Sequence, residues 1–399
     1  MTEIRLQVTS HISDFDAPSW DRLVENQSNP FVMHAFLELL ERSKSIGVGT
    51  GWEPFYIGAF NHDELVGATF VYLKDHSYGE YIFDWAFADV AQQLGLPYYP
   101  KLVCAIPFTP ATGPRLISSA PDDADLVRDA LLHGVFEVQK ELGAHSIHFL
   151  FCLDEEARFL EERDFIRRAS HQFHWRNANY ACFDDFLGAF KSRARKQIRK
   201  ERARLDEANI KRVLISGSEA SAEDWNIIYR FYTSTIGRKW GSPYLSRQFF
   251  DLAKESLGEL SILGLAYKDG TPIAGTLSFK KSKHLYGRYW GAVQYVDGLH
   301  FDMCYYQLID YAISNKLRLV EAGAQGEHKI KRGYVPMVTH SGHWFANPRL
   351  HQLVSQFLKR ERASYEREIP HWASICPFKE NHFPEGPLCA GLPEDDGSA

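Results

Sequence analysis

The feature of this chain that most constrains its fold is an internal repeat, a β-hairpin pattern that occurs once in each half. The first hairpin spans 53–73, with a turn at 61–64 and Gly67 in its second strand. The second spans 261–279, with a turn at 269–270 and Gly275 at the place of Gly67. Apolar strands joined by short Asn, Asp or Gly turns are typical of hairpins. Their recurrence predicts a duplicated unit.

The match between the two copies continues beyond the hairpins. The further paired segments, first copy before second, are an aromatic third strand (78–85; 284–291), an amphipathic helix (126–142; 301–315), a buried strand (146–151; 317–322) and a last strand ending in His-Trp (174–175; 343–344). In both helices the apolar residues recur at helical spacing and form one stripe. The paired endings indicate that the whole unit is repeated.

Length and composition agree with two domains. A chain of 399 residues with 45% hydrophobic residues is long enough for two cores of roughly 150 to 200 residues each. We predict a first domain with an N-terminal helical region and a Pro-rich insertion (1–185), a basic linking helix (186–212), a second domain with a C-terminal helix (213–376) and a loosely ordered tail (377–399).

Composition also excludes several classes of protein. No apolar run approaches the ~20 residues of a membrane helix, and the first residues lack the layout of a signal peptide, so we expect a cytoplasmic protein. The six cysteines are scattered without a CxxC pair, which indicates neither a disulfide framework nor a metal site. With a net charge of -6, any polyanionic partner must bind to a local patch.

The order of elements resembles that of GNAT acyltransferase domains, and longer motifs resemble the bacterial FemAB-like, or peptidoglycan biosynthesis/recognition, family. These motifs are Thr50–Phe55, Tyr99–Leu116, Phe173–Asn177, Arg195–Arg202 and Gly323–Lys329. The resemblance implies an α/β fold with mixed α+β sheets, built as tandem GNAT-like domains with flanking helices. It also implies acyl or aminoacyl transfer, because Fem-type enzymes use aminoacyl-tRNA as donor. Fold-level likeness does not fix the substrate.

The segment 321–334 is the first candidate site, because in a GNAT fold it follows the strand that opens the acceptor cleft. Glycines permit a ligand to approach the backbone closely, carboxylates and imidazole can take a proton, and cations can hold phosphates or a carboxylate. The expected catalytic residues are Glu321, Glu327 and His328, and the expected substrate-binding residues are Gln325, Gly326, Lys329 and Arg332. The alternative is a polar loop of solvated charges.

The Pro-rich insertion, 87–121, is the second candidate. Prolines fix the backbone and lower the entropic cost of holding a binding loop, so Thr109, Thr112 and Arg115 are candidate substrate-binding residues. A structural cover over the sheet is the competing interpretation.

The run 191–204 forms a basic patch with eight cations against the single acid Glu201. Such density attracts nucleic-acid phosphates. The predicted donor phosphate-binding residues are Arg195, Lys196, Arg199 and Lys200. The alternative is a solvated helix that packs by its aliphatic stems.

The third strand of the second copy supplies a last set of candidates. Alternation predicts that Tyr286, Arg288 and Trp290 share one face and bind substrate, although core packing would also explain them. An acetyl-CoA enzyme has a Gly-rich pyrophosphate-binding turn before the next helix. Only fragments of that turn remain in 294–300, and Asp297 would repel phosphate, so acyl-CoA is the less favoured donor.

We therefore predict a transferase that moves an acyl or aminoacyl group from aminoacyl-tRNA or acyl-CoA onto an amine or hydroxyl of a small molecule or cell-wall precursor. Such a reaction needs deprotonation, positioning and oxyanion donors rather than a metal. The competing hypothesis is a non-catalytic module that recognises a cell-wall precursor or a protein, whose binding would survive loss of Glu327 and His328.

Overall fold

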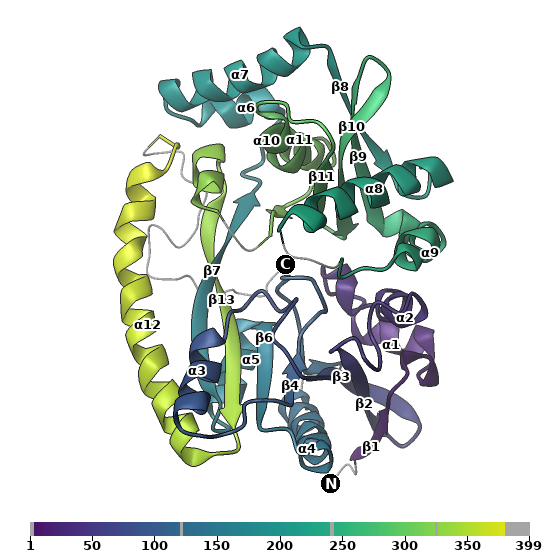
Figure 1. The fold of residues 1–399 in the computed structure, drawn as a ribbon, viewed down its shortest axis with the longest axis vertical. Coiled ribbons are helices and arrows are strands. Elements are labelled where there is room, and N and C mark those ends of the chain that lie inside the picture. Colours follow the sequence, from purple (N-terminus) through teal and green to yellow (C-terminus); the bar gives the residue numbers. More distant parts are fainter. Residues whose placement is uncertain (1–3, 120–122, 240–242, 324–325, 380–399) are drawn as a thin grey trace. The chain divides into compact units, whose positions relative to one another are not determined.

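The computed structural model describes residues 4–119, 123–239, 243–323 and 326–379 (Figure 1). The chain forms two compact units. In the described residues, unit 1 comprises 4–170 and 339–366, and unit 2 comprises 171–338 and 367–379. Neither unit is a continuous stretch of sequence, because the strands β7 and β13 and the helix α12 each have residues in both.

Unit 1 is built on a mixed sheet. Its strands, in spatial order, are β1 (Ile4–Thr9), β2 (Glu53–Asn61), β3 (Glu64–Lys74), β4 (Lys101–Cys104), β6 (Ser146–Cys152) and β13 (Val335–Phe345), with the short β5 (Ile117–Ser118) beside β3. Neighbouring strands are antiparallel except β4 and β6, which are parallel. All seven residues of β6 are buried, which is expected of a strand covered on both faces.

Helices pack on this sheet through apolar stripes. They are α1 (Ala17–Leu23), α2 (His34–Arg42), α3 (Trp85–Gln93), α4 (Ala124–Leu142), α5 (Asp154–Glu161) and the first part of α12 (Pro348–Ile375). The predicted helix at 126–142 is α4, and its Val127 lies against β3 at Gly67, where a Cβ would come within 2.3 Å of the valine. Gly67 therefore sets how closely this helix approaches the sheet.

Unit 2 repeats the plan. Its strands, in spatial order, are the end of β7 (Ile166–Arg176), β12 (Leu319–Glu321), β11 (His284–Ala292), β10 (Thr271–Lys281), β9 (Ser261–Lys268) and β8 (Ile210–Ser216). Again one pair, β11 and β12, is parallel, and the other neighbours are antiparallel. The predicted second hairpin and its third strand are confirmed as β9, β10 and β11.

The helices of unit 2 include one irregular segment. They are α6 (Phe183–Gly188), α7 (Ser192–Glu207), α8 (Ala222–Lys239), α9 (Arg247–Leu257), α10 (Leu299–Phe301), a π-helical turn (Asp302–Tyr306), α11 (Gln307–Ser314) and the end of α12. The predicted helix at 301–315 is thus one continuous helical stretch that contains a π turn. Such turns are frequent at functional sites.

Three expectations about elements need correction. The predicted third strand at 78–85 is wrong, because these residues form a loop that leads into α3. Its place beside β3 is taken by β4, which lies within the predicted insertion. The predicted linking helix is two helices, α6 and α7, and the divisions at residues 185 and 212 differ from the boundaries of the compact units.

The first residues of the predicted C-terminal tail, 377–379, are packed against unit 2. Phe378 is 3% exposed and its ring centroid lies 4.8 Å from that of Phe190. Lys379 N donates to the carbonyl of Ala189 at 2.9 Å. Residues 380–399 lie outside the described residues. Among the helices of the described residues, none is long and apolar enough to cross a membrane.

Candidate active site in unit 2

The candidate site lies where the parallel strands β11 and β12 separate. Their pairing lasts three residues and ends at the rung of Tyr286 and Glu321. Beyond this rung the chain of β12 turns away at Gly323, whose φ of +81° favours glycine. Beyond the rung β11 continues to Ala292 without pairing to β12, and we call this end of the strand pair the opening.

A buried ion cluster closes the paired end of the opening. The Glu321 carboxylate lies 3.7 Å from the Arg288 guanidinium and 4.0 Å from His174 Nε2. Arg288 NH1 also donates to the carbonyl of Gly287 at 2.9 Å. Burial and the surrounding cations lower the pKa of His174 to about 3, so this imidazole is neutral at physiological pH. Glu321 is therefore engaged by Arg288, and its role as a catalytic base stays a prediction.

Lys329 lies beside this cluster in a short 3₁₀ segment, Glu327–Arg332. Its side chain is nearly buried, and its Nζ donates to the carbonyl of Gly323 at 2.7 Å. Burial, with a smaller effect of the Arg288 charge, lowers the pKa of Lys329 to about 7. This amine thus exchanges a proton near neutral pH, and it holds the chain at the open end of β12.

His328 and Tyr305 form the pair best suited to proton transfer. The Tyr305 hydroxyl lies 2.9 Å from His328 Nε2. Tyr305 is 4% exposed, on the π-helical turn, whereas His328 is exposed. Burial and the charges of Arg332 and Lys329 lower the pKa of His328, and burial raises the pKa of Tyr305. At neutral pH the pair therefore consists of a neutral imidazole and a protonated phenol.

The backbone at Gly326 shapes this pair. Its φ is +110°, and a Cβ there would lie 2.3 Å from the His328 ring. Glycine is therefore required for the imidazole to reach Tyr305, and the expected role of Gly326 in binding substrate stays a prediction. Gln325, which we also expected to bind substrate, lies outside the described residues.

Arg332 joins this region to the basic helix α7. Its NH1 donates to the carbonyl of His328 at 2.8 Å, its guanidinium lies 3.4 Å from the centroid of the Phe301 ring, and its NH2 lies 3.5 Å from the Glu201 carboxylate. Glu201 also accepts a hydrogen bond of 2.6 Å from Tyr306. The single acid of the basic run is thus used to attach α7 to the π-helical turn.

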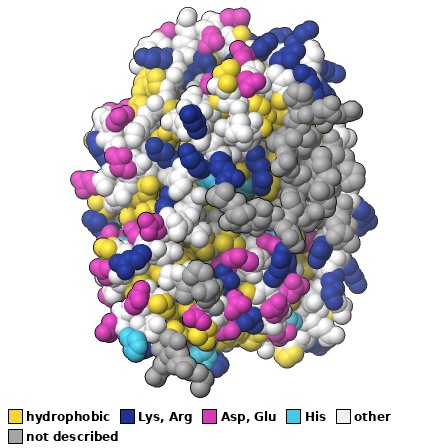
Figure 2. Space-filling view, turned by 180° about the vertical axis from the view of Figure 1, so that it is seen from behind, with side chains coloured by type: hydrophobic (Ala, Val, Ile, Leu, Met, Phe, Trp, Pro, Cys, Tyr) yellow, Lys and Arg dark blue, Asp and Glu magenta, His cyan; other side chains and the backbone are white. Residues whose placement is uncertain are grey.

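Lys and Arg side chains gather near the top right of Figure 2, where α7 lies. The cations of α7 form two sets, one paired with carboxylates and one lining a recess at the surface. Arg202 pairs with Asp302 and Asp310, Arg204 with Asp297, and Arg199 with Asp184. By contrast, an open surface recess is lined by Ser192, Arg193, Lys196, Gln197 and Lys200. Lys196 and Lys200 are exposed and Arg195 is half-buried.

Several predicted residues are not brought to this site. Glu327 is exposed, and its carboxylate lies 4.0 Å from the exposed His371. Trp290 does not share a face with Tyr286, because a β-bulge inserts Arg288 between the pairs Ser278–Gly287 and Leu277–Tyr289 and shifts the alternation. The indole of Trp290 instead lies 5.2 Å from His300, beside the core under α10.

The predicted binding residues of the insertion belong to unit 1 and are part of its structure. Arg115 is completely buried, and its guanidinium donates to the carbonyls of Leu150, Ala111, Gly113 and Pro114. Thr109 is 2% exposed, and the half-buried Thr112 accepts a hydrogen bond from Asn29 at its carbonyl. The prediction that Arg115 binds substrate is therefore wrong, because the segment uses its polar groups to satisfy its own backbone.

The structure also adds a residue that we did not select. Tyr305 was visible only as a polar aromatic residue near the start of an amphipathic helix. The contact with His328 joins two segments that lie 23 residues apart, and Tyr305 lies on a π turn that no sequence pattern indicated.

The two units and their separating parallel strands define a tandem GNAT-like fold. Residues 11–380 match the FemAB-like family, described as peptidoglycan biosynthesis/recognition, and the chain belongs to this family. Similar solved structures include FemX, at 13% identity over 88% of this chain and 100% of FemX, with a TM-score of 0.54. L-PGS from Bacillus licheniformis is 10% identical over 86% of this chain and 97% of its own, with a TM-score of 0.53. No curated protein matches the chain. At such low identity these structures support the fold alone.

Proposed function

We propose that unit 2 transfers an acyl or aminoacyl group from an activated, anionic donor to an amine or hydroxyl of a cell-wall precursor. The observation that carries this proposal is the pair of Tyr305 and His328 beside the opening between β11 and β12. The family description supports a peptidoglycan-related acceptor. Membership of the FemAB-like family, whose Fem-type relatives use aminoacyl-tRNA as donor, favours aminoacyl transfer as the form of the reaction.

The reaction requires one proton to leave the attacking amine and one proton to reach the leaving oxygen of the donor. The acceptor nitrogen attacks the carbonyl carbon of the donor ester, and the bond from that carbon to the leaving oxygen breaks. The proton of the attacking amine passes to Tyr305 oxygen as the phenolic proton passes to His328 Nε2, and it returns by the same route to the leaving oxygen. A neutral imidazole at physiological pH is able to act in this way. Positioning of the two reactants contributes further to the rate.

The contacts of α7 favour aminoacyl-tRNA over acyl-CoA as donor. The start of α10, where an acetyl-CoA enzyme would bind pyrophosphate, is close to α7: a Cβ at Gly298 would lie 3.8 Å from the carbonyl oxygen of Glu201. Asp297 at the same place pairs with Arg204 at 3.3 Å. Meanwhile Arg193, Lys196 and Lys200 line a recess open to solvent, as a polyanion requires.

A transfer assay tests the reaction. Purified protein would be incubated with tRNA carrying a radiolabelled amino acid and with a UDP-linked muropeptide, and label on the peptide would be measured. We expect Tyr305→Phe and His328→Asn each to lower the single-turnover rate about 100-fold, the usual size of a general acid-base contribution. Tyr311→Phe, on α11 of the same helical stretch, is the control. Rates equal to wild type in both site variants would contradict the proposed proton route, and binding of the muropeptide without any transfer would favour a recognition module.

The donor is tested separately by binding. Lys196→Glu/Lys200→Glu should weaken tRNA binding at least about tenfold and reduce its salt dependence. Lys211→Glu/Lys283→Glu, at exposed positions elsewhere in unit 2, makes the same change in net charge and should have a small effect. Thermal stabilisation of the wild type by acetyl-CoA and not by tRNA would reverse the order of donors.

A further inference from the structure

The loop 75–84 of unit 1, between β3 and α3, reverses the usual distribution of side chains. Glu80 and Asp84 are each 4% exposed, whereas Tyr78, Phe83 and the first residue of α3, Trp85, are 57%, 53% and 51% exposed. Burying carboxylates while exposing aromatic rings is unfavourable for folding alone. Packing of unit 1 alone therefore does not explain why these aromatic side chains are exposed, whereas a binding function would.

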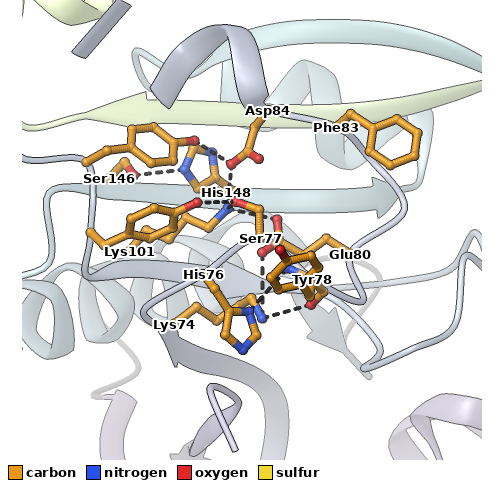
Figure 3. A network of polar contacts seen from close by, with 12 residues as sticks. Lys74, His76, Ser77, Tyr78, Glu80, Phe83, Asp84, Lys101, Ser146 and His148 are labelled. Atoms are coloured by element: carbon orange, nitrogen blue, oxygen red, sulfur yellow. Dashed lines mark hydrogen bonds and ion pairs between the residues drawn. The ribbon is translucent and has the colours of Figure 1, made fainter. Parts of the chain in front are cut away.

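A buried polar network holds the loop in this form (Figure 3). Lys101 Nζ lies 2.9 Å from the Glu80 carboxylate and also contacts Asp84. Lys74 Nζ donates to the carbonyls of Gly51, at 3.1 Å, and Tyr78, at 3.2 Å. Both ammonium groups have no exposed side-chain surface. The inward side of the loop is thus fixed by charge-assisted hydrogen bonds, which are the stronger kind.

The outward residues are held through their backbone. The carbonyl of Tyr78 also accepts a hydrogen bond of 3.2 Å from the Trp52 indole, and the carbonyl of Phe83 accepts one of 2.9 Å from Arg168. In Figure 3 the Phe83 ring points away from the network. The rings of Tyr78 and Trp85 lie 6.2 Å apart. These aromatic side chains are therefore presented on a rigid backbone before any ligand arrives, which lowers the entropic cost of binding.

The exposed apolar surface continues onto the part of α12 that belongs to unit 1. Phe357 is 38% exposed, and its ring lies 6.1 Å from that of Phe87, over which the guanidinium of Arg168 sits at 5.4 Å. Leu353, one turn earlier, is 37% exposed. Of the ten large hydrophobic side chains that are exposed in the described residues, five lie on this surface, so it is a patch rather than scattered exposure.

Cations adjoin the apolar residues. Arg360 follows Leu353 and Phe357 at the spacing of one helix face, and Lys359 is its neighbour. Both are exposed, and in the described part of the chain no ion pair is formed by either. Tyr, Trp and Phe rings beside unpaired cations are a combination found on proteins that bind to the surface of a bilayer.

We propose that Tyr78, Phe83, Trp85, Leu353 and Phe357, with Lys359 and Arg360, form a surface that binds the interface of a membrane containing anionic lipid. We call it the aromatic surface. Its aromatic side chains are of the kinds that enter the interfacial layer, and its cations match anionic headgroups. The inference does not depend on the transfer reaction, since it concerns unit 1 and the proposed active site lies in unit 2.

Co-sedimentation with vesicles tests the aromatic surface on the full-length protein. We expect the wild type to bind vesicles of phosphatidylcholine and phosphatidylglycerol more tightly than vesicles of phosphatidylcholine alone. Phe83→Ser/Trp85→Ser should weaken this binding at least about tenfold, because two half-buried rings are lost. Val293→Ser/Tyr295→Ser, which removes an exposed apolar pair from unit 2, is the matched control and should bind as the wild type does.

The charge component is tested by Lys359→Gln/Arg360→Gln, which should lower binding to the phosphatidylglycerol vesicles about tenfold and leave the weak binding to phosphatidylcholine unchanged. All substituted side chains are exposed, and thermal unfolding would verify that each variant is folded. Failure of the wild type to bind either vesicle would overturn the proposal. Equal vesicle binding by the Phe83/Trp85 variant and its control would also overturn it. The same holds if vesicle binding is lost in Lys196→Glu/Lys200→Glu instead. A wild-type dimer that only the Phe83/Trp85 variant abolishes, without vesicle binding, would assign the surface to a second copy of the chain.

Discussion

At the scale of single residues, burial makes the positive charge costly for two of the three buried lysines in the described residues. Burial lowers the pKa of Lys329 in unit 2 and of Lys74 in unit 1 to about 7 in each case. The two differ in their surroundings: Lys74 has Glu80 at 3.6 Å, whereas Lys329 has the carbonyl of Gly323 and the positive Arg288 nearby. Retaining an amine beside the opening of β11 and β12 is consistent with a role in binding or proton transfer.

Stability should therefore depend on pH through Lys329. A lysine in the unfolded chain holds its proton until about pH 10.4, while the folded lysine releases it from about pH 7. Between these values the unfolded state binds more protons, so the free energy of unfolding rises with pH, by at most about 1.4 kcal/mol per pH unit. Urea unfolding between pH 7 and pH 9 should show a smaller rise in Lys329→Met than in the wild type. The exposed Lys331→Met is the control, and equal slopes in all three proteins would contradict the prediction.

Which site residues could be predicted depended on their local surroundings. His328 and Lys329 follow a strand and a glycine turn, and the sequence alone indicated a functional segment there. Arg115 was misjudged because its partners are the carbonyls of its own Pro-rich segment and of Leu150. The pairing of Glu321 with Arg288 was equally invisible, because the two residues lie on different strands. The sequence around a single charged residue does not show whether that residue pairs with a ligand or with another residue of the same protein.

At the scale of elements, periodicity predicted the hairpins and amphipathic helices, because alternation and helical spacing reflect one buried face. It failed where charge overrides that pattern. Residues 78–85 are rich in aromatic side chains, as a strand often is, yet the carboxylates of Glu80 and Asp84 point to Lys101 and the rings of Tyr78, Phe83 and Trp85 face solvent. The bulge at Arg288 was likewise invisible, because one extra residue changes the face of Trp290 without changing the composition of β11.

The packing of α8 on β11 depends on one glycine. A Cβ on Gly291 would lie 1.7 Å from the carbonyl oxygen of Phe231 in α8, and a backbone atom cannot move aside alone. Gly291→Ala should therefore lower the free energy of unfolding by about 3 kcal/mol, measured by urea denaturation. Gly188→Ala, at the end of α6 with no atom within 4 Å of the added Cβ, should be neutral or slightly stabilising. Similar losses in both variants would show that the close contact is not responsible.

At the scale of the whole molecule, each half of the repeat is completed by strands from elsewhere in the chain. In unit 1, β6 pairs with the end of β13, where His343 lies opposite His148. In unit 2, β12 pairs with the end of β7, where His174 lies opposite Glu321. The sequence predicted the duplication. It did not indicate that the last strand of each copy also pairs with the other unit's strands, because a strand that ends in His-Trp fits either copy. The predicted boundary at residue 185 therefore divides unit 1 from part of its own sheet.

This pairing of strands between the copies makes a prediction about fragments. The fragment 1–185 lacks β13 and α12, so it would leave one edge of the buried β6 unpaired and would expose the cluster in which Phe345 and Leu350 pack on Phe87. We expect it to aggregate or to unfold without cooperativity. Residues 1–170 joined to 339–366 by a short Gly-Ser linker should instead give one cooperative transition in urea, because Ser170 and Thr339, 2.8 Å apart at their hydroxyl oxygens, place the new ends side by side. A cooperative transition for 1–185, with none for the joined fragment, would mean that the sheet of unit 1 is complete without β13.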